Sequence, residues 1–178
     1  MLADREIQLP LGSAKLVSRE ALQNYDIWPR AFAGKWKDHR YYEIVDQALH
    51  GFEHHYLVLQ DRGGKIRGVQ PIFFVQQNLI EGVPGKFASA IDLVRKVFPR
   101  FLTMRVLMVG CAAGAGELGA ASREDQEWTA EALPEALHSL ARQTNPSLIV
   151  FKDFYARYRG DLDSLGSYGY VQIGRAHV

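Results

Sequence analysis

The sequence predicts one α/β domain, of the α+β kind, in which a mixed sheet is flanked by helices. Short apolar runs typical of strands alternate along the chain with longer amphipathic runs typical of helices. Two of the strands are joined by a short turn that contains glycine, whereas the later strands are separated by helical stretches. Because tight hairpins give antiparallel pairs and helical crossovers give parallel pairs, the sheet should contain both kinds.

The composition is that of an ordinary globular protein. The chain has 178 residues, of which 47% are hydrophobic and 23% are charged, and its formal net charge is +1. This balance does not call for nucleic acid or an anionic membrane as a partner. A single cysteine excludes a disulfide framework within the chain and a cysteine-rich zinc site.

The apolar segments are too short to cross a membrane. The longest uncharged stretch around the glycines, residues 106–116, is well below the roughly 20 apolar residues of a spanning helix. Asp4, Arg5 and Glu6 stand where a signal peptide would need an apolar core. We therefore expect a soluble, cytoplasmic protein with no membrane span.

A β-hairpin is the clearest local signal in the first half of the chain. Two strands, Tyr56–Leu59 and Ile66–Val75, flank the turn residues Asp61–Gly64. Pro71 lies inside the second run and predicts an edge position or a bulge there. Before the hairpin we expect a short strand over Lys15–Ser18, a helix entry at Trp28 and a helix over Tyr41–Leu49.

The second half predicts helices and strands in alternation. Ser122 and Asp125 have capping-box spacing and open a helix toward Arg142, which Pro134 should kink or restart. The other elements expected are a loop over Asn78–Lys86, a helix over Ala88–Val97, a buried strand over Val106–Val109, a strand over Leu148–Phe151, a helix over Tyr155–Leu165 and the start of a strand at Tyr170–Val171.

A glycine-rich loop, residues 110–119, leaves the buried strand and enters a helical region. Small residues let backbone N–H groups approach a phosphate closely, so this context suits an anionic ligand such as a pyrophosphate. A tight strand-to-helix turn that needs glycines only for packing would look the same. The sequence leaves both interpretations open.

Two nucleotide-binding interpretations of this loop fit poorly. Gly114, Gly116 and Gly119 match a dinucleotide fingerprint, but the next strand and its acid, Asp153, come too late in the chain. The loop is also similar to that of S-adenosylmethionine-dependent methyltransferases. Those enzymes carry an acid at the position of Met108 and a glycine at that of Ala112, and both are absent here. A methyltransferase is kept as an alternative.

The order of elements resembles the GNAT acyltransferase superfamily. The pyrophosphate loop of that family is Gln or Arg, two residues, Gly, any residue, then Gly or Ala, which corresponds here to Cys111-Ala112-Ala113-Gly114-Ala115-Gly116. Cys111 departs from the Gln or Arg of the pattern. The resemblance implies a mostly antiparallel sheet whose C-terminal strands are incomplete in this chain.

The chain is more closely similar to the FemAB-like branch, bacterial N-acyltransferases linked to peptidoglycan biosynthesis. The residues that carry this resemblance are Asp38–Tyr42, Val97–Phe101, Leu107–Cys111 and Phe151–Phe154. Members of this branch are about twice as long and have two related halves. The resemblance therefore implies that this chain is the first half. In Fem-like enzymes one half can lose its acyl-CoA site.

The resemblance also implies a site and its ligands. Residues Cys111, Ala112, Ala113, Gly114, Ala115 and Gly116 would bind the pyrophosphate of an acyl-CoA such as acetyl-CoA, and Tyr158, or else Tyr155, would protonate the leaving thiolate. Asp153 or Glu117 would be the general base. The acceptor would be a small-molecule or peptide amine, and aminoacyl-tRNA is the alternative donor. If the domain is not catalytic, it would serve as a scaffold or recognition half without a cofactor.

Other candidate residues have simpler interpretations. We expect Cys111 to be a small buried residue, and His54 and His55 to face opposite sides of a strand, where they cannot easily share a metal ion. A basic cluster of Arg95, Lys96, Arg100 and Arg105 could contact an anionic carrier or tRNA, but such a run is more typical of a solvated surface.

The last six residues, 173–178, are interpreted as foreign to the natural protein. The string Ile-Gly-Arg-Ala-His-Val is encoded by ATC GGA AGA GCA CAC GTC, which is similar to a widely used sequencing adapter. We therefore expect an acyltransferase-like domain over residues 1–172 and adapter-derived residues over 173–178. On this interpretation the chain is a fragment that lacks the C-terminal half of the same protein.

Overall fold

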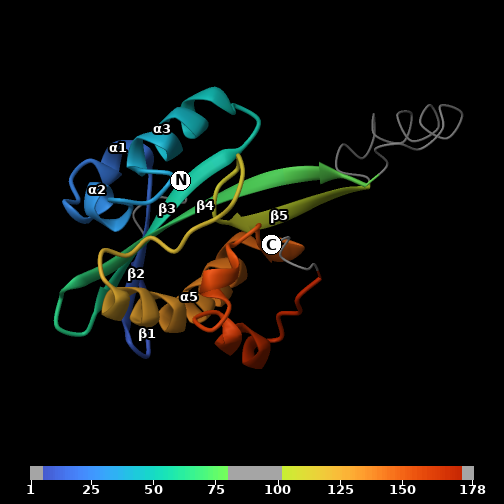
Figure 1. Ribbon diagram of the computed structural model, residues 1–178. Coiled ribbons are helices and arrows are strands. Elements are labelled where there is room, and N and C mark those ends of the chain that lie inside the picture. Colours follow the sequence, from blue (N-terminus) through green and yellow to red (C-terminus); the bar gives the residue numbers. More distant parts are fainter. Residues whose placement is uncertain (1–5, 80–101, 174–178) are drawn as a thin grey trace, which may run out of the picture.

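The computed structural model describes residues 6–79 and 102–173, which form one mixed sheet flanked by helices (Figure 1). The strands are β1 (Glu6–Leu9), β2 (Gly12–Val17), β3 (Glu53–Asp61), β4 (Ile66–Asn78), β5 (Thr103–Val109) and β6 (Leu148–Phe151). The helices are α1 (Arg19–Leu22), α2 (Ile27–Ala31), α3 (His39–Ala48) and α5 (Arg123–Thr144), followed by the 3₁₀ helices η1 (Ala156–Tyr158) and η2 (Asp163–Tyr168).

The strands lie in sequence order across the sheet, from β1 to β6. Neighbours are antiparallel from β1 to β5, and β5 pairs with β6 in parallel across the crossover helix α5. The expected mixed, mostly antiparallel sheet is therefore confirmed.

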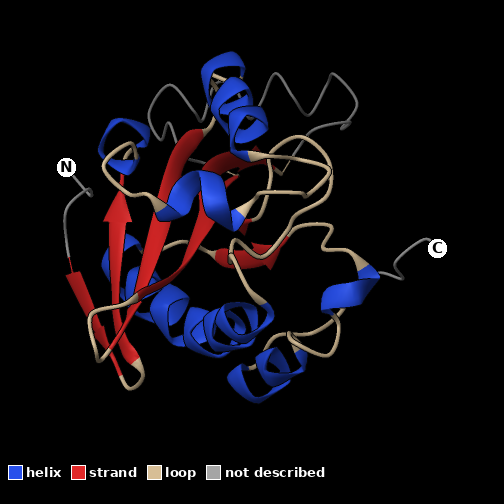
Figure 2. Cartoon of the chain, turned by 60° about the vertical axis from the view of Figure 1, so that its left-hand side comes forward, coloured by secondary structure: helices blue, strands red, loops and turns tan. Residues whose placement is uncertain are grey.

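Each face of the sheet has its own hydrophobic core, because successive side chains of a strand point to opposite faces. Figure 2 shows helices on both faces. In β3, Leu57 and Leu59 pack toward α5, whereas Tyr56 and Val58 pack toward α1, α2 and α3. Because β3 is apolar on both faces in this stretch, its sequence is a continuous apolar run.

The N-terminal hairpin is longer than the sequence predicts. The short strand expected over Lys15–Ser18 is β2, which begins at Gly12, and β1 pairs with it. Ile7 and Leu9 of β1 are buried while Glu6 is exposed, which is the alternation of an edge strand. This strand was missed because a run of four residues gives little periodicity.

Pro71 does not lie on an edge strand, nor at a bulge. It sits in the interior strand β4 opposite Tyr56, and the register shift of this pair lies at Leu59 and Gln60 instead. The Pro71 carbonyl accepts from Gly110 N at 3.0 Å, just beyond the end of β5. In an antiparallel strand the N–H and C=O of a residue face the same neighbour. The missing N–H of Pro71 therefore faces Gly110 O and removes a single hydrogen bond, at the very end of the β4–β5 ladder.

Helix α5 is one continuous helix that begins where the capping pattern predicts. Ser122 is the N-cap and its hydroxyl accepts from Asp125 N at 3.1 Å. Pro134 lies inside the helix and is buried, so it does not start a new helix. The burial of this helix against the sheet outweighs the loss of one backbone hydrogen bond at the proline.

Two predictions for the C-terminal part are wrong. Tyr155–Leu165 is not one helix, because the chain turns at Asp161, whose buried carboxylate accepts from Arg123 and from Gln126 of α5. Tyr170–Val171 does not begin a strand. The Tyr170 N–H donates to Leu165 O at 3.2 Å and not to a neighbouring strand. The ring of Tyr170 stacks on that of His138 in helix α5.

Four sequence predictions fall wholly or largely outside the described residues. These are the helix over Ala88–Val97, most of the loop over Asn78–Lys86, the basic cluster apart from Arg105, and all but the first of the adapter-derived residues 173–178.

Candidate functional site

The glycine loop crosses the C-terminal ends of the parallel strands β5 and β6. Lys152 N donates to Val109 O at 3.0 Å, and Gly116 N donates to Asp153 O at 3.1 Å. A Cβ on Gly116 would lie 2.8 Å from Lys152 O. Gly116 is therefore required by the close approach of the two chain segments.

The end of the loop packs on β4. Val69 N donates to Gly119 O at 2.8 Å, and a Cβ on Gly119 would lie 1.9 Å from Val69 O. The buried Gln70 amide donates to Glu117 O at 3.2 Å and accepts from Gly119 N at 3.4 Å. Packing therefore accounts for two glycines of the apparent dinucleotide fingerprint, Gly116 and Gly119.

Gly114 has no such packing reason. Its φ of +78° lies in the left-handed region, and the nearest atom to a Cβ placed there would be Lys37 Nζ at 2.8 Å. The backbone N–H groups of Ala112, Gly114 and Ala115 donate no hydrogen bond to any described residue. Neighbouring N–H groups without acceptors can bind an anion.

Two lysines hold the carbonyls of the same loop. Lys37 Nζ donates to Ala113 O at 3.1 Å and to Ala115 O at 2.6 Å, and Lys152 Nζ donates to Gly114 O at 3.2 Å. Lys152 also pairs with Asp153 at 2.9 Å, whereas no carboxylate of residues 6–79 or 102–173 pairs with Lys37. Burial lowers the pKa of Lys37, and Cys111 and Glu117 partly offset this.

Lys35 anchors a part of the loop closer to α5. Its Nζ donates to Leu118 O and Ala120 O. Burial lowers the pKa of Lys35 to about 8, and the charge of Glu117 opposes that shift. Lys35 and Lys37 cannot be recognised as site residues from the sequence, because both lie between α2 and α3 and meet the loop only in the folded chain.

Glu117 is the most deeply buried charged group of the site. Its Oε2 accepts from Arg157 Nη2 at 2.9 Å and from the Tyr158 hydroxyl at 3.2 Å. Its Oε1 has no hydrogen-bond partner among the described residues, and neither has the buried Tyr42 hydroxyl. A buried polar atom without a partner indicates a place for water, a ligand or catalysis.

The two tyrosines assigned from the family resemblance differ in exposure. Tyr158 is 2% exposed and belongs to the core between the sheet and α5, whereas Tyr155 is 37% exposed. Burial raises the pKa of the Tyr158 hydroxyl. Arg157 covers both rings, at 4.8 Å from the centre of Tyr155 and 5.0 Å from that of Tyr158. Tyr158 therefore contacts Glu117 but is closed to solvent, whereas Tyr155 is open to solvent and is connected to Glu117 through Arg157.

The other candidates from the sequence are placed as follows. Cys111 is buried, and this burial raises the pKa of its thiol although Ala113 N and two lysines lower it. The side chain of Asp153 points into solvent and pairs with Lys152. His54 and His55 lie on β3, and the described His, Cys, Asp and Glu residues form no group of three that could hold a metal ion.

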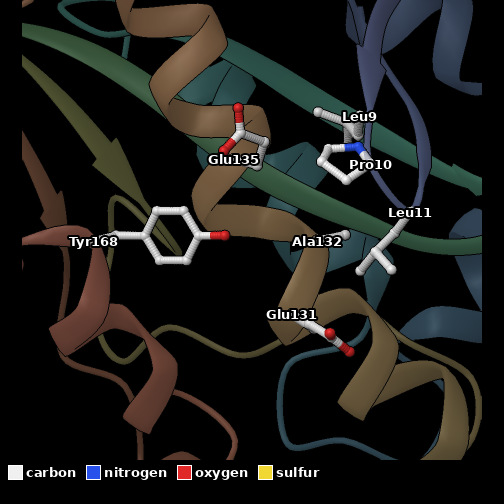
Figure 3. A pocket seen from close by; sticks show the side chains of 7 residues that line it. All are labelled: Leu9, Pro10, Leu11, Glu131, Ala132, Glu135 and Tyr168. Carbon is white, nitrogen blue, oxygen red and sulfur yellow. The ribbon is translucent and has the colours of Figure 1, made fainter.

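A small cavity of about 160 Å³ lies between the β1–β2 hairpin, α5 and η2 (Figure 3). Leu9, Pro10 and Leu11 form its apolar side, and Glu131, Glu135 and Tyr168 its polar side. None of these residues belongs to the glycine loop or to the Glu117 cluster. The cavity therefore has no part in the candidate site.

Comparisons with known proteins support the fold and nothing beyond it. No known protein family matches this sequence, and no curated protein is significantly similar to it. The fold is similar to that of a point mutant of the BH1408 protein from Bacillus halodurans, with a TM-score of 0.56, 12% identity, and coverage of 93% of this chain and 96% of that one. In the described part of the chain, no helix combines the length and apolar character that a bilayer crossing requires.

Proposed function

We propose that this chain is a domain for N-acyl transfer, with an acyl thioester such as acetyl-CoA as donor and an amine as acceptor. One observation supports this function above all: the amides of Ala112, Gly114 and Ala115 have no described acceptor and lie in a loop held by two lysines. Neighbouring N–H groups without acceptors, close to positive charge, are a combination that binds a phosphate.

The position of the loop agrees with a long, phosphate-bearing donor. The loop lies at the C-terminal ends of two parallel strands, and it joins β5 to α5. In α/β proteins this end of a parallel pair is where ligands bind. A donor with its diphosphate on the loop could extend its thioester toward the cluster of Glu117, Arg157 and Tyr158.

The reaction needs proximity and two proton transfers. The amine nitrogen attacks the thioester carbonyl carbon, the new C–N bond forms, and the C–S bond breaks. The amine loses one proton to a base, and the leaving thiolate takes one proton from an acid. Holding the two reactants together supplies much of the rate enhancement in such a transfer.

The candidate groups for these proton transfers are Glu117, Tyr155 and Tyr158. Glu117 is the base that we favour, because its Oε1 has no described donor whereas Asp153 is exposed and paired with Lys152. Glu117 has no exposed side-chain surface, so the proton must reach it through a chain of hydrogen bonds. Tyr155 is the accessible acid; the Tyr158 hydroxyl donates to Glu117 and positions it.

A non-catalytic binding half is the second candidate function. The burial of Glu117 and Tyr158 favours it, because a reacting group must be able to meet its substrate. Unlike the scaffold without a cofactor that the sequence leaves open, this half would still hold the acyl donor, or a related phosphate compound, without transferring the acyl group. Binding and turnover therefore have to be measured separately.

The test is a calorimetric titration of acetyl-CoA into the whole chain and into two glycine variants. Gly114→Glu places a negative charge beside Lys37 Nζ and should abolish binding. Gly169→Ala is the matched control, because Gly169 has a similar φ of +83° but has nothing within 4 Å of its Cβ position.

The outcomes separate the candidate functions. Binding to the wild type and to Gly169→Ala, together with release of thiol when amines are added, supports acyl transfer. Binding without turnover supports the non-catalytic half. If the folded wild type does not bind acetyl-CoA, the proposed function is wrong, and saturable binding of S-adenosylmethionine would then favour a methyltransferase.

A further inference from the structure

Three successive carbonyls of the glycine loop accept hydrogen bonds from lysines. The carbonyls of Ala113 and Ala115 both accept from Lys37 Nζ, at 3.1 and 2.6 Å. The carbonyl between them, that of Gly114, accepts from Lys152 Nζ at 3.2 Å. The two lysines are far apart in the sequence: Lys37 precedes α3, and Lys152 directly follows β6.

Holding a carbonyl also fixes the direction of the next amide. In a trans peptide the C=O of one residue and the N–H of the following residue point in opposite directions. The described residues contain no cis peptide. Lys37 therefore sets the direction of the Gly114 and Gly116 N–H groups, and Lys152 sets that of Ala115.

Of these three amides, one has an acceptor and two have none. Gly116 N donates to Asp153 O at 3.1 Å, whereas the N–H groups of Gly114 and Ala115 reach no acceptor in the described chain. The lysines thus hold two donors in a fixed direction without using them. Preorganised donors of this kind favour an anion, because no reorganisation is needed when it binds.

We infer that Lys37 and Lys152 are positioning residues, which hold the Gly114 and Ala115 amides in the orientation that receives a phosphate group. This inference rests on the proposed function, and it adds residues to which neither the sequence nor the family resemblance assigns a role. Neither lysine needs to touch the ligand. Lys37 is the stronger of the two, because it holds two carbonyls and is only 6% exposed.

The loop needs such support because its own residues give little. Residues 112–116 are alanines and glycines without polar side chains, and Gly114 can adopt more than one backbone conformation at little cost. Without the lysines, the peptides around Gly114 are free to rotate and turn their N–H groups away from a ligand.

The experiment measures the binding of acetyl-CoA and of inorganic pyrophosphate to the whole chain and to three lysine variants. Lys37→Met and Lys152→Met remove the two positioning residues. Lys35→Met is the matched control, because Lys35 comes from the same segment as Lys37 and also donates to two loop carbonyls, those of Leu118 and Ala120. Urea unfolding of each variant records its loss of stability separately.

We expect Lys37→Met to weaken the binding of both ligands roughly 10-fold or more, because the variant removes the hydrogen bonds that the charged Lys37 ammonium donates to the loop. Lys152→Met should show the same effect to a smaller extent and, being a surface change, keeps the test valid if Lys37→Met does not fold. Lys35→Met should bind both ligands like the wild type even where it is less stable.

The failures of the inference and of the proposed function can be told apart. If acetyl-CoA binds the wild type and both positioning variants equally well, the inference is wrong and the proposed function stands. If pyrophosphate alone binds, and binds less well to Lys37→Met, the inference stands and the proposed donor is wrong. If the folded wild type binds neither ligand, both are wrong.

Discussion

Arg157 and Glu117 form an ion pair in which only one partner meets solvent. Their Nη2 and Oε2 atoms are 2.9 Å apart, and the side chain of Arg157 is 57% exposed while that of Glu117 is not exposed at all. The pair ties the segment after β6 to the glycine loop. It also supplies the counter-charge that a buried carboxylate requires.

Replacing Arg157 by methionine should therefore destabilise the fold. The variant leaves the buried Glu117 carboxylate with Tyr158 as its remaining side-chain donor, and an incompletely paired buried charge costs about 1–3 kcal/mol. Urea unfolding measures the loss. Arg159→Met is the control, because Arg159 is an exposed neighbour with no ion pair in the described chain, and an equal loss in both variants would contradict this account.

The pH dependence of stability should carry a contribution from Lys35. Burial lowers the pKa of Lys35 from 10.5 to about 8, so between these values the unfolded chain binds more protons than the folded chain. Stability then rises with pH across this window, by on the order of 3 kcal/mol for a shift of this size. The penalty for the buried charge is present in full below the lower value.

The measurement compares the wild type with Lys35→Met at several pH values from 7 to about 10.5. Tyrosine and cysteine side chains also titrate in this range, so the difference between the two proteins is the quantity of interest. We expect this difference to change in favour of the wild type as the pH rises. A difference that does not vary with pH would contradict the assigned burial.

Cys111 should react slowly with thiol reagents in the native protein. Its side chain is buried, and burial raises the pKa of the thiol, so little thiolate is present near neutral pH. We expect modification by a chromogenic disulfide to be more than about 10-fold slower than in urea, where the thiol is free. A native rate equal to the unfolded rate would mean that the loop exposes Cys111.

Gly119 should tolerate no side chain. A Cβ there would lie 1.9 Å from Val69 O, so Gly119→Ala must push the loop away from β4. Overpacking of this kind typically lowers the free energy of unfolding by about 1–3 kcal/mol or more. Gly160→Ala, with nothing within 4 Å of its Cβ position, should leave the midpoint of urea unfolding almost unchanged. Similar midpoints for the two variants would contradict the close approach.

The elements that sequence analysis predicts well are those with strong local patterns. The hairpin of β3 and β4 follows from two apolar runs around a glycine turn, and the start of α5 follows from the Ser122 cap. The helix expected over 155–165 fails because a contact distant in sequence decides it: the buried Asp161 carboxylate binds Arg123 and Gln126. Local periodicity contains no information about such a contact.

The candidate site shows the same division. The glycine loop is predictable from the sequence, because its small residues directly follow a buried strand. Lys37 is not, because its ammonium group meets Ala113 across 76 positions of the chain. The separate roles of the glycines are not predictable either: Gly116 and Gly119 are needed for packing, whereas Gly114 faces Lys37.

The most direct test of the central claim is the ¹H–¹⁵N spectrum of the chain with and without acetyl-CoA. If the loop holds the donor's phosphates, the amide signals of Ala112, Gly114 and Ala115 shift strongly, while that of Gly116, already bonded to Asp153 O, shifts less. If acetyl-CoA moves signals elsewhere and leaves these three unchanged, the loop does not bind the donor and the account is wrong.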